Sequence, residues 1–238
     1  MNMDMLMGEQ IAAAQLADWR KLAQGLHARY LIEDFTTGAQ FAMAVGEAGD
    51  VLGHHPRVTL GSGFVDLKLV SDNAIYRDGE GGEHVVQWVT RQDIDLARRI
   101  SEIAAEREMH ADPSSCSHIE LGLDTGDSAT IAPVWTALLT GNAEDQGRGT
   151  PDGDEVRDAW GRVPNMWFGE VSEGETPRQR FHVEVYVSPE VVEERIAAAL
   201  AAGGVIVDDS NAPMLITIAD QDGNTGTLCA DTSAATAG

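Results

Sequence analysis

The spacing of apolar residues divides the first hundred positions into helical and extended stretches. Apolar residues recur at helical intervals from Phe35 to Ala48, which predicts an amphipathic helix. Asp34 and Thr36 are candidate N-caps for this helix, and Gly53 ends it. Alternating or aromatic-rich stretches predict strands over residues 26–32, 57–60 and 64–70. The remaining expected elements are a short helix over 9–16, a polar loop over 72–83 and a strongly amphipathic helix over 90–107.

The order of elements changes after the short polar segment 108–115, where we place a domain boundary. Beyond it, two successive βαβββ units are predicted, which is an internal repeat of architecture. The expected strands are 119–123, 155–160, 166–171, 181–187, 205–207, 214–219 and 227–230, and the expected helices are 131–139 and 189–202. The stretch 143–154 is expected to be a flexible loop. The chain therefore divides into domains 1–107 and 116–238.

Composition narrows the classes of partner. The 238 residues include 16 Lys and Arg against 39 Asp and Glu, a formal net charge of −23. A surface this negative repels phosphate backbones and anionic lipid, so we expect neither nucleic acid nor membrane as a partner. The first basic residue is Arg20, which argues against a signal peptide, and only two cysteines, Cys116 and Cys229, are present. These features predict a cytoplasmic protein.

The candidate chemistry starts at two adjacent histidines, His54 and His55, which follow the first amphipathic helix directly. Histidine is the side chain whose ordinary pKa lies nearest neutrality, so a rigid pair can exchange protons with a small polar substrate. Pro56 stiffens the turn that carries them. Asp50, one helical turn before His54, is expected to orient that ring.

Further residues around this pair resemble the pterin-4a-carbinolamine dehydratases. The resemblance is carried by Glu9-Gln-Ile-Ala, Trp19, Tyr30, Asp34-Phe35, Phe41, Asp50-x-x-x-His54-His55-Pro56, Val65 to Leu69, and Thr90-x-x-Asp93 with Leu96-Ala97 and Ile100. It covers residues 9–105 and implies an α+β fold in which a four-stranded antiparallel sheet carries helices on one face. It also implies a homo-oligomer, such as a dimer, and a pterin cleft lined by three histidines with no cofactor or metal.

The resemblance assigns roles to individual residues. His54 and His55 match the histidine pair of the family, Asp50 its upstream acid and Asp93 its aspartate at the start of a helix. The implied reaction is an elimination in which one group protonates the departing 4a-hydroxyl and another removes the N5 proton. For Asp93, a helix-capping role with Thr90 is an equally good interpretation.

The third histidine of the family is missing, because Asp72 stands at its position. Three hypotheses follow: His84 folds back into the gap, Asp72 acts as the acid or base, or the domain binds a pterin-like ring without turnover. Pro56 and Trp88 are expected to line the pterin pocket, and Trp88 to narrow it.

The second domain resembles glyoxalase-like members of the vicinal oxygen chelate superfamily. The resemblance spans residues 116–232 and is carried by Glu120-Leu-Gly-Leu-Asp124, Pro133-x-Trp135, Leu138-Leu139, Val163-Pro164, Trp167-Phe168, Arg180-Phe-His182-Val-Glu184-Val and Asp220-x-x-Gly223-Asn224. Trp135, Trp167 and His182 are candidate pocket residues. Aromatic residues at this spacing are more often simply packed in a core, and a half-buried strand histidine bonded to a neighbouring loop is the better interpretation of His182.

A metal site in this domain would need about three converging ligands. The candidates are His118, Glu120, His182 and Glu184, but Thr225-Gly226 stands where metal-using members place a glutamate. We therefore expect no metal. The sequence thus predicts a two-domain enzyme of the hydro-lyase class with a small, pterin-like substrate. The alternatives are a binding protein with two degenerate pockets, and a scaffold for helical protein partners.

Overall fold

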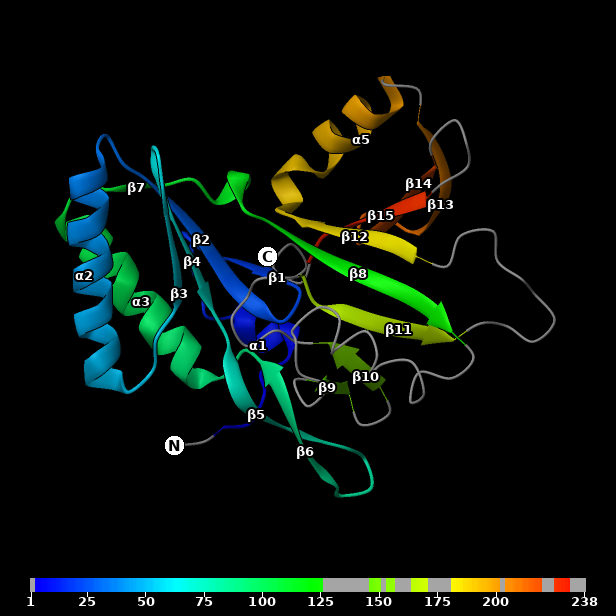
Figure 1. Ribbon diagram of the computed structural model, residues 1–238, viewed down its shortest axis with the longest axis horizontal. Helices are drawn as coiled ribbons and strands as arrows, with labels where there is room; N and C mark the ends of the chain where they lie inside the picture. Colours follow the sequence, from blue (N-terminus) through cyan, green and yellow to red (C-terminus); the bar gives the residue numbers. More distant parts are fainter. Residues whose placement is uncertain are drawn as a thin grey trace. The chain divides into compact units, whose positions relative to one another are not determined.

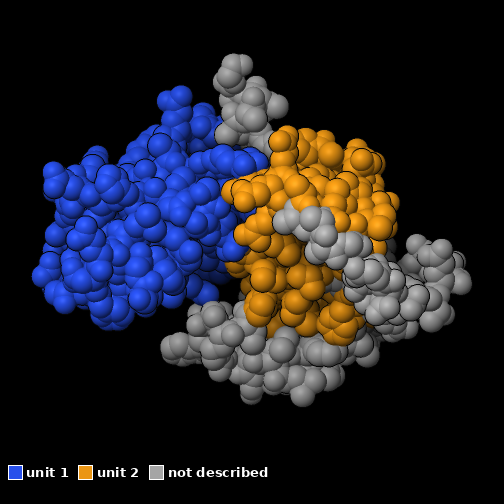
Figure 2. Space-filling model, turned by 90° about the horizontal axis from the view of Figure 1, so that it is seen from above, with its two compact units in different colours: residues 1–117, 187–190, 231–238 blue, residues 118–186, 191–230 orange. Residues whose placement is uncertain are grey.

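The computed structural model describes residues 3–125, 146–150, 153–156, 164–170, 181–201, 204–219 and 225–231. The chain forms two compact units, coloured separately in Figure 2. Unit 1 comprises residues 1–117 with 187–190 and 231–238, and unit 2 comprises 118–186 and 191–230.

Unit 1 is an α+β structure in which helices cover one face of an antiparallel sheet, as expected (Figure 1). Its elements are α1 (Gly8–Ala12), β1 (Arg20–Leu22), β2 (Gly25–Leu31), α2 (Phe35–Leu52), β3 (Arg57–Gly61), β4 (Phe64–Leu69), β5 (Ser71–Arg77), β6 (Glu83–Trp88), α3 (Arg91–Glu106) and β7 (His110–Ala111). The main sheet has the strand order β1-β2-β4-β3, and the short β7 pairs with β2. The four antiparallel strands on the main path match the prediction, and β7 adds a fifth strand that was not predicted.

The boundaries of α2 follow from local chemistry. The Oδ1 atom of Asp34 accepts a hydrogen bond from the Thr37 backbone N–H at 2.8 Å, so Asp34 is the N-cap. At the other end, Gly53 adopts a left-handed conformation with φ of 65°, which ends the helix. Gly38 lets α2 approach the sheet, because a Cβ there would come within 2.5 Å of Leu60.

The core of unit 1 lies between the sheet and the two long helices. The apolar faces of α2 and α3 meet the inner face of β2 and β4, and each large side chain buried there contributes roughly 1.5–3 kcal/mol. Its fully buried large side chains include Leu26, Tyr30, Phe41, Leu67, Leu69, Ile94, Leu96 and Ile100.

The stretch 72–83 is not a loop, which corrects the prediction. It forms most of a hairpin in which β5 pairs with β6. Polar residues and glycines suggested a loop, but residues 72–77 belong to β5 and only 78–82 form the turn. Ile75 and Tyr76 pair with Val85 and His84. The hairpin also binds the N-terminal segment, since the backbone N–H of Met5 donates to the Ile75 carbonyl at 3.0 Å.

Unit 2 contains the predicted internal repeat. Its elements are β8 (Ser117–Thr125), β9 (Gln146–Thr150), β10 (Gly153–Val156), β11 (Met166–Glu170), β12 (Phe181–Val187), α5 (Val192–Ala201), β13 (Val205–Asn211), β14 (Leu215–Ala219) and β15 (Thr225–Cys229). The sheet order is β13-β14-β15-β12-β8-β11-β10-β9. The first strand of each repeat pairs in parallel with its own last strand, β8 with β11 and β12 with β15.

The hairpin of β9 and β10 departs from the predicted structure of unit 2. The expected loop over 143–154 is wrong where it overlaps β9 and the start of β10, because these two strands pair antiparallel. The glycines that suggested a loop lie inside an extended hairpin, where a lack of side chains does not prevent backbone pairing. The expected helix over 131–139 lies outside the described residues.

Two further observations concern the whole described chain. None of its described helices is both long and apolar enough to cross a lipid bilayer. Cys116 and Cys229 are free and buried, and burial raises the pKa of the Cys116 thiol to about 11.

Candidate active site

The end of α2 positions the two histidines. The backbone N–H of His54 donates to the Gly49 carbonyl at 3.1 Å, so the turn that leaves the helix is bonded back to it. The left-handed Gly53 reverses the chain at this point, and Pro56 limits the turn from the other side. The backbone that carries both imidazole rings is therefore constrained on each side.

His54 is bonded to a fully buried carboxylate. Its Nε2 atom lies 2.7 Å from Asp93 Oδ1, and the two side chains are 13% and 0% exposed. An ionised carboxylate only accepts, so the contact assigns the proton of the neutral ring to Nε2 and leaves Nδ1 as the second ring nitrogen. The sequence separation of 39 residues shows that the contact depends on the packing of α3 beside the end of α2.

Asp93 is held by donors on its other oxygen as well. Oδ2 accepts from the Thr90 backbone N–H at 2.8 Å and from the Ser71 hydroxyl at 2.7 Å. The Thr90 side chain in turn caps the backbone at Asp93, which completes a capping box. One carboxylate oxygen of Asp93 therefore caps α3 and the other contacts His54, which confirms the capping role, while the catalytic role of Asp93 stays a prediction.

His55 forms a second pair of the same chemical type in an open setting. Its Nε2 lies 2.9 Å from Asp50 Oδ1, and the side chains are 52% and 79% exposed. The expectation that Asp50 orients His54 is therefore wrong. The turn after Gly53 brings the second imidazole back over α2 and carries the first toward α3.

Gly49 makes room for the His55 ring. A Cβ at Gly49 would lie 2.6 Å from His55 Cδ2 and 2.8 Å from the His54 carbonyl oxygen. Real Cβ contacts are longer than this, so any side chain at position 49 would displace the imidazole or the turn. Gly49 thus belongs to the site although it carries no chemical group.

The two candidates for the missing third histidine lie on the β5–β6 hairpin. Asp72 is exposed and accepts a hydrogen bond from Gln87 Nε2, whereas its neighbour Ser71 is buried. His84 Nε2 lies 2.9 Å from Asp78 Oδ2, and this bond is the main cause that lowers the pKa of Asp78. His84 pairs with Tyr76, five residues along β5 from Ser71, a span of roughly 16 Å. Neither side chain joins the His54–Asp93 pair.

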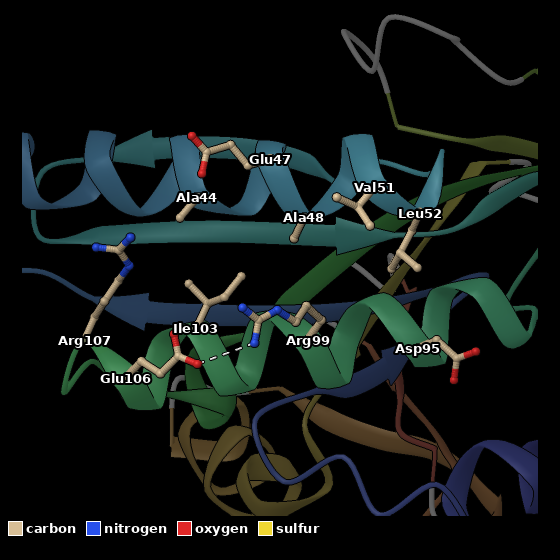
Figure 3. Close-up of a pocket in the computed structure, with 10 residues that line it drawn as sticks. All are labelled: Ala44, Glu47, Ala48, Val51, Leu52, Asp95, Arg99, Ile103, Glu106 and Arg107. Carbon is tan, nitrogen blue, oxygen red and sulfur yellow. Dashed lines mark hydrogen bonds and ion pairs between the residues drawn. The ribbon is translucent and has the colours of Figure 1, made fainter.

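The remaining pocket candidates of unit 1 have structural partners. Trp88 pairs with Ser71 across the hairpin, and its indole N–H donates to the Leu6 carbonyl at 2.9 Å. The ammonium of Lys21 lies 4.4 Å from the centre of the Trp88 ring. Pro56 is half-buried. A groove of about 480 Å³ lies between α2 and α3, with Ala48, Leu52 and Ile103 among its lining residues, but its lining includes neither histidine (Figure 3).

In unit 2 the candidates divide between described and undescribed residues. Trp167 is half-buried in β11, beside Gly122 of β8. Trp135 and the side chain of His182 lie outside the described residues. Glu120 is buried and accepts from Asn165 Nδ2 at 3.2 Å, while the Tyr186 hydroxyl donates to Glu184 at 3.0 Å.

Two of the candidate metal ligands of unit 2, His118 and Glu120, lie close together. His118 Nε2 lies 3.6 Å from Glu120 Oε1. Within the described parts of the chain, no three side chains of the His, Cys, Asp and Glu types converge on one point. Because the His182 side chain is not among them, the absence of a metal stays a prediction.

Sequence reasoning missed three residues of the site. Thr90 was identified only as a cap, while Ser71 and Gly49 were not identified at all. Ser71 gave a weak signal, a small hydroxyl residue at the start of a strand. Gly49, within a helix, could have been suspected because glycine disfavours helix interiors and so indicates a close approach.

Comparisons with known proteins agree with both resemblances. Residues 5–103 match the family model described as pterin 4 alpha carbinolamine dehydratase, and residues 120–229 match the one described as glyoxalase-like domain. A protein of Natronomonas pharaonis named as a pterin-4-alpha-carbinolamine dehydratase is 31% identical over 101 residues, which are 42% of this chain and 97% of that relative.

Two more relatives cover the same part of the chain. A protein of the same name from Nocardia farcinica is 32% identical over 106 residues, 44% of this chain and 99% of that relative. A crystal structure described as a transcriptional coactivator/pterin dehydratase from Brucella melitensis is 25% identical, covers 42% of this chain and 99% of that one, and has a TM-score of 0.34. The resemblances predicted from the motifs are confirmed.

Proposed function

Because the chain belongs to the pterin-4a-carbinolamine dehydratase family through residues 5–103, and carries a glyoxalase-like domain over 120–229, we propose that unit 1 dehydrates a 4a-hydroxytetrahydropterin. The C4a–O bond breaks, the N5 proton leaves, and a C4a=N5 double bond forms. The products are water and a quinonoid dihydropterin. The reaction needs one acid and one base.

The buried pair of His54 and Asp93 is suited to act as the general base. With Nε2–H bonded to Asp93, His54 presents Nδ1 to the N5 proton, and the carboxylate stabilises the imidazolium that forms. His55, bonded to Asp50 in contact with solvent, is assigned as the acid that protonates the departing hydroxyl and is then recharged from water. The observation that carries this proposal is the 2.7 Å contact between His54 and a carboxylate that is 0% exposed.

A second function, binding of a pterin-like ring without turnover, is favoured by a different observation. Asp72 stands at the position of the third family histidine but bonds Gln87 at the surface, and His84 bonds Asp78 further along the hairpin. Only two imidazoles then remain for the elimination. General acid–base groups contribute about 10²–10⁴-fold each, so losing one slows turnover without abolishing it, and we place catalysis first.

The experiment follows dehydration of a 4a-hydroxytetrahydropterin by absorbance, using the full chain. We expect acceleration over the spontaneous rate, and His54→Ala is expected to lower the rate at least tenfold, the scale of a lost general base. His110→Ala is the matched control, because His110 is an exposed histidine in β7 of the same unit.

The other outcomes distinguish the candidates. No acceleration by the unmodified protein, with the pterin still bound in equilibrium dialysis, would establish the binding function instead. His84→Ala is expected to change the rate less than twofold. A loss as large as that of His54→Ala would show that the hairpin supplies the third imidazole.

We also propose that the enzyme acts as a homodimer in the cytoplasm. The family membership supports an oligomer with a small-molecule substrate. Light scattering coupled to gel filtration is expected to give twice the chain mass of 25.5 kDa. A monomeric mass would contradict the dimer and leave the assignment of the histidines untouched.

A further inference from the structure

Ser71 is a buried hydroxyl that the proposed elimination does not use, and it contacts the carboxylate that holds His54. Its Oγ donates to Asp93 Oδ2 at 2.7 Å, and the residue is 2% exposed. Ser71 belongs to β5 and Asp93 to α3, so the contact joins two separate elements. Such a group needs an explanation, because burying a hydroxyl is unfavourable unless it is well bonded.

Capping of α3 does not require Ser71. The Thr90 backbone N–H already donates to Asp93 Oδ2, and the Thr90 side chain accepts from the backbone of Asp93. The capping box is complete between these two residues. The Ser71 hydroxyl is therefore an additional donor, and its effect falls on the charge and orientation of the carboxylate.

The hydroxyl groups of Ser71 and Thr90 can donate in either of two directions, and the distances favour one of them. In the first direction, Thr90 donates to Ser71 over 2.8 Å and Ser71 donates to Asp93 over 2.7 Å. In the second, Ser71 donates to Thr90 and Thr90 donates to Asp93 over 3.1 Å. Hydrogen bonds to an ionised oxygen are short and strong, which favours the first direction. Oδ2 is then saturated, and Oδ1 is directed to His54.

A β-bulge in β5 directs the Ser71 side chain toward Asp93. Between Ser71 and Ala74, β5 has one residue more than the facing part of β6, so the strand bulges there. Ser71 and Ala74 are both buried although three residues apart, while Asp72 and Asn73 face outward. A regular strand would alternate and could not place this set of side chains in the same way.

We propose that Ser71 is a positioning residue: by saturating Asp93 Oδ2 it directs Oδ1 to Nε2 of His54 and keeps Nδ1 as the nitrogen that receives the substrate proton. Its effect on rate rests on the proposed function. Its effect on the His54 ring does not, because the tautomer of that ring can be measured without substrate.

The test compares variants of the full chain by two readouts. Imidazole ¹⁵N chemical shifts report the tautomer of His54, and steady-state kinetics report kcat and KM separately. Ser71→Ala is expected to give a mixed tautomer and a kcat about tenfold lower at unchanged KM, the scale of one hydrogen bond to a charged group. Ser71→Thr keeps the hydroxyl on a strand that accepts β-branched residues, and is expected to restore both readouts.

Three further variants separate positioning from general loss of structure. Ser101→Ala is the matched control, because Ser101 Oγ accepts from Trp19 Nε1 in the same unit, away from the histidines. Ser71→Cys keeps the volume with a weaker donor, and is expected to lose rate even if Ser71→Ala does not fold. Adding Ser71→Ala to Asp93→Asn is expected to cost no further rate, since Ser71 acts through that carboxylate.

An unchanged His54 tautomer in Ser71→Ala, with kcat within twofold of the unmodified chain, would overturn the proposal. An equal loss in Ser101→Ala would do the same. If the unmodified chain does not dehydrate the pterin, the proposed function fails, and the ¹⁵N spectra alone decide the role of Ser71.

Discussion

Two adjacent histidines of this protein each contact an aspartate, and the two pairs differ in almost everything else. His54 and Asp93 are nearly or fully buried, whereas His55 and Asp50 are both more than half exposed. The first aspartate has further donors from Ser71 and Thr90, and it lies 39 residues from its histidine. Asp50 lies only five residues before His55, in the last turn of α2.

The difference in burial and bonding matches the two different roles that we propose for the histidines. A buried carboxylate with saturated partners fixes the tautomer and direction of an imidazole, which is what a base needs. A solvent-exposed pair is held loosely and exchanges protons with water, which suits the acid. Three substitutions test this contrast, taken from the largest expected effect to the smallest.

Asp93→Asn should have the largest effect. The amide oxygen would take the Oδ2 position, where Ser71 and Thr90 donate, so the amide NH₂ would face His54 Nε2. His54 would then have to accept at Nε2 and carry its proton on Nδ1, the wrong tautomer for a base. We expect the rate to fall about 10²–10⁴-fold, measured by the pterin dehydration assay.

The matched control is Asp95→Asn, because Asp95 is exposed on the same helix and pairs with Arg91. That variant should keep the rate of the unmodified chain. An Asp93→Asn rate within threefold of the unmodified chain would remove the buried pair from the mechanism.

Gly49→Ala should have an intermediate effect, on the exposed pair. The new Cβ would meet the His55 ring and the His54 carbonyl at under 3 Å, so the turn must shift. We expect about a tenfold loss of rate and a stability cost of about 1–3 kcal/mol from overpacking, measured by the assay and by urea unfolding.

Gly46→Ala provides the control in the same helix, since a Cβ there meets nothing within 4 Å. Alanine favours helix over glycine, so this variant should gain about 0.5–1 kcal/mol at full activity. Equal behaviour of the two variants would show that Gly49 has no special relation to the histidines.

Asp50→Asn should have the smallest effect. Exposed ion pairs contribute little because water and salt screen them, so we expect at most about a threefold change in rate. The change should shrink further as ionic strength is raised in the same assay. A loss comparable to that of Asp93→Asn would mean that the two pairs are equivalent, contrary to the contrast drawn from their burial.

Much of this site was predictable because its signals are local. The N-cap Asp34 and the ending Gly53 marked α2, so the position of His54 and His55 just past a helix end followed from the sequence. The capping role of Asp93 was also predicted, from its spacing of three residues after Thr90. The partner of Asp50 was predicted wrongly, because helical spacing says nothing about where a chain turns after a left-handed glycine.

The sequence by itself determined the two amphipathic helices, most of the strands of unit 2 and the histidine pair, since periodicity and capping depend on neighbouring residues. Only the tertiary structure decided that the stretch 72–83 pairs as a hairpin, that Ser71 reaches Asp93, and that Gly49 lies beneath His55. These features depend on contacts between separate elements, where packing selects among conformations that are locally similar in free energy.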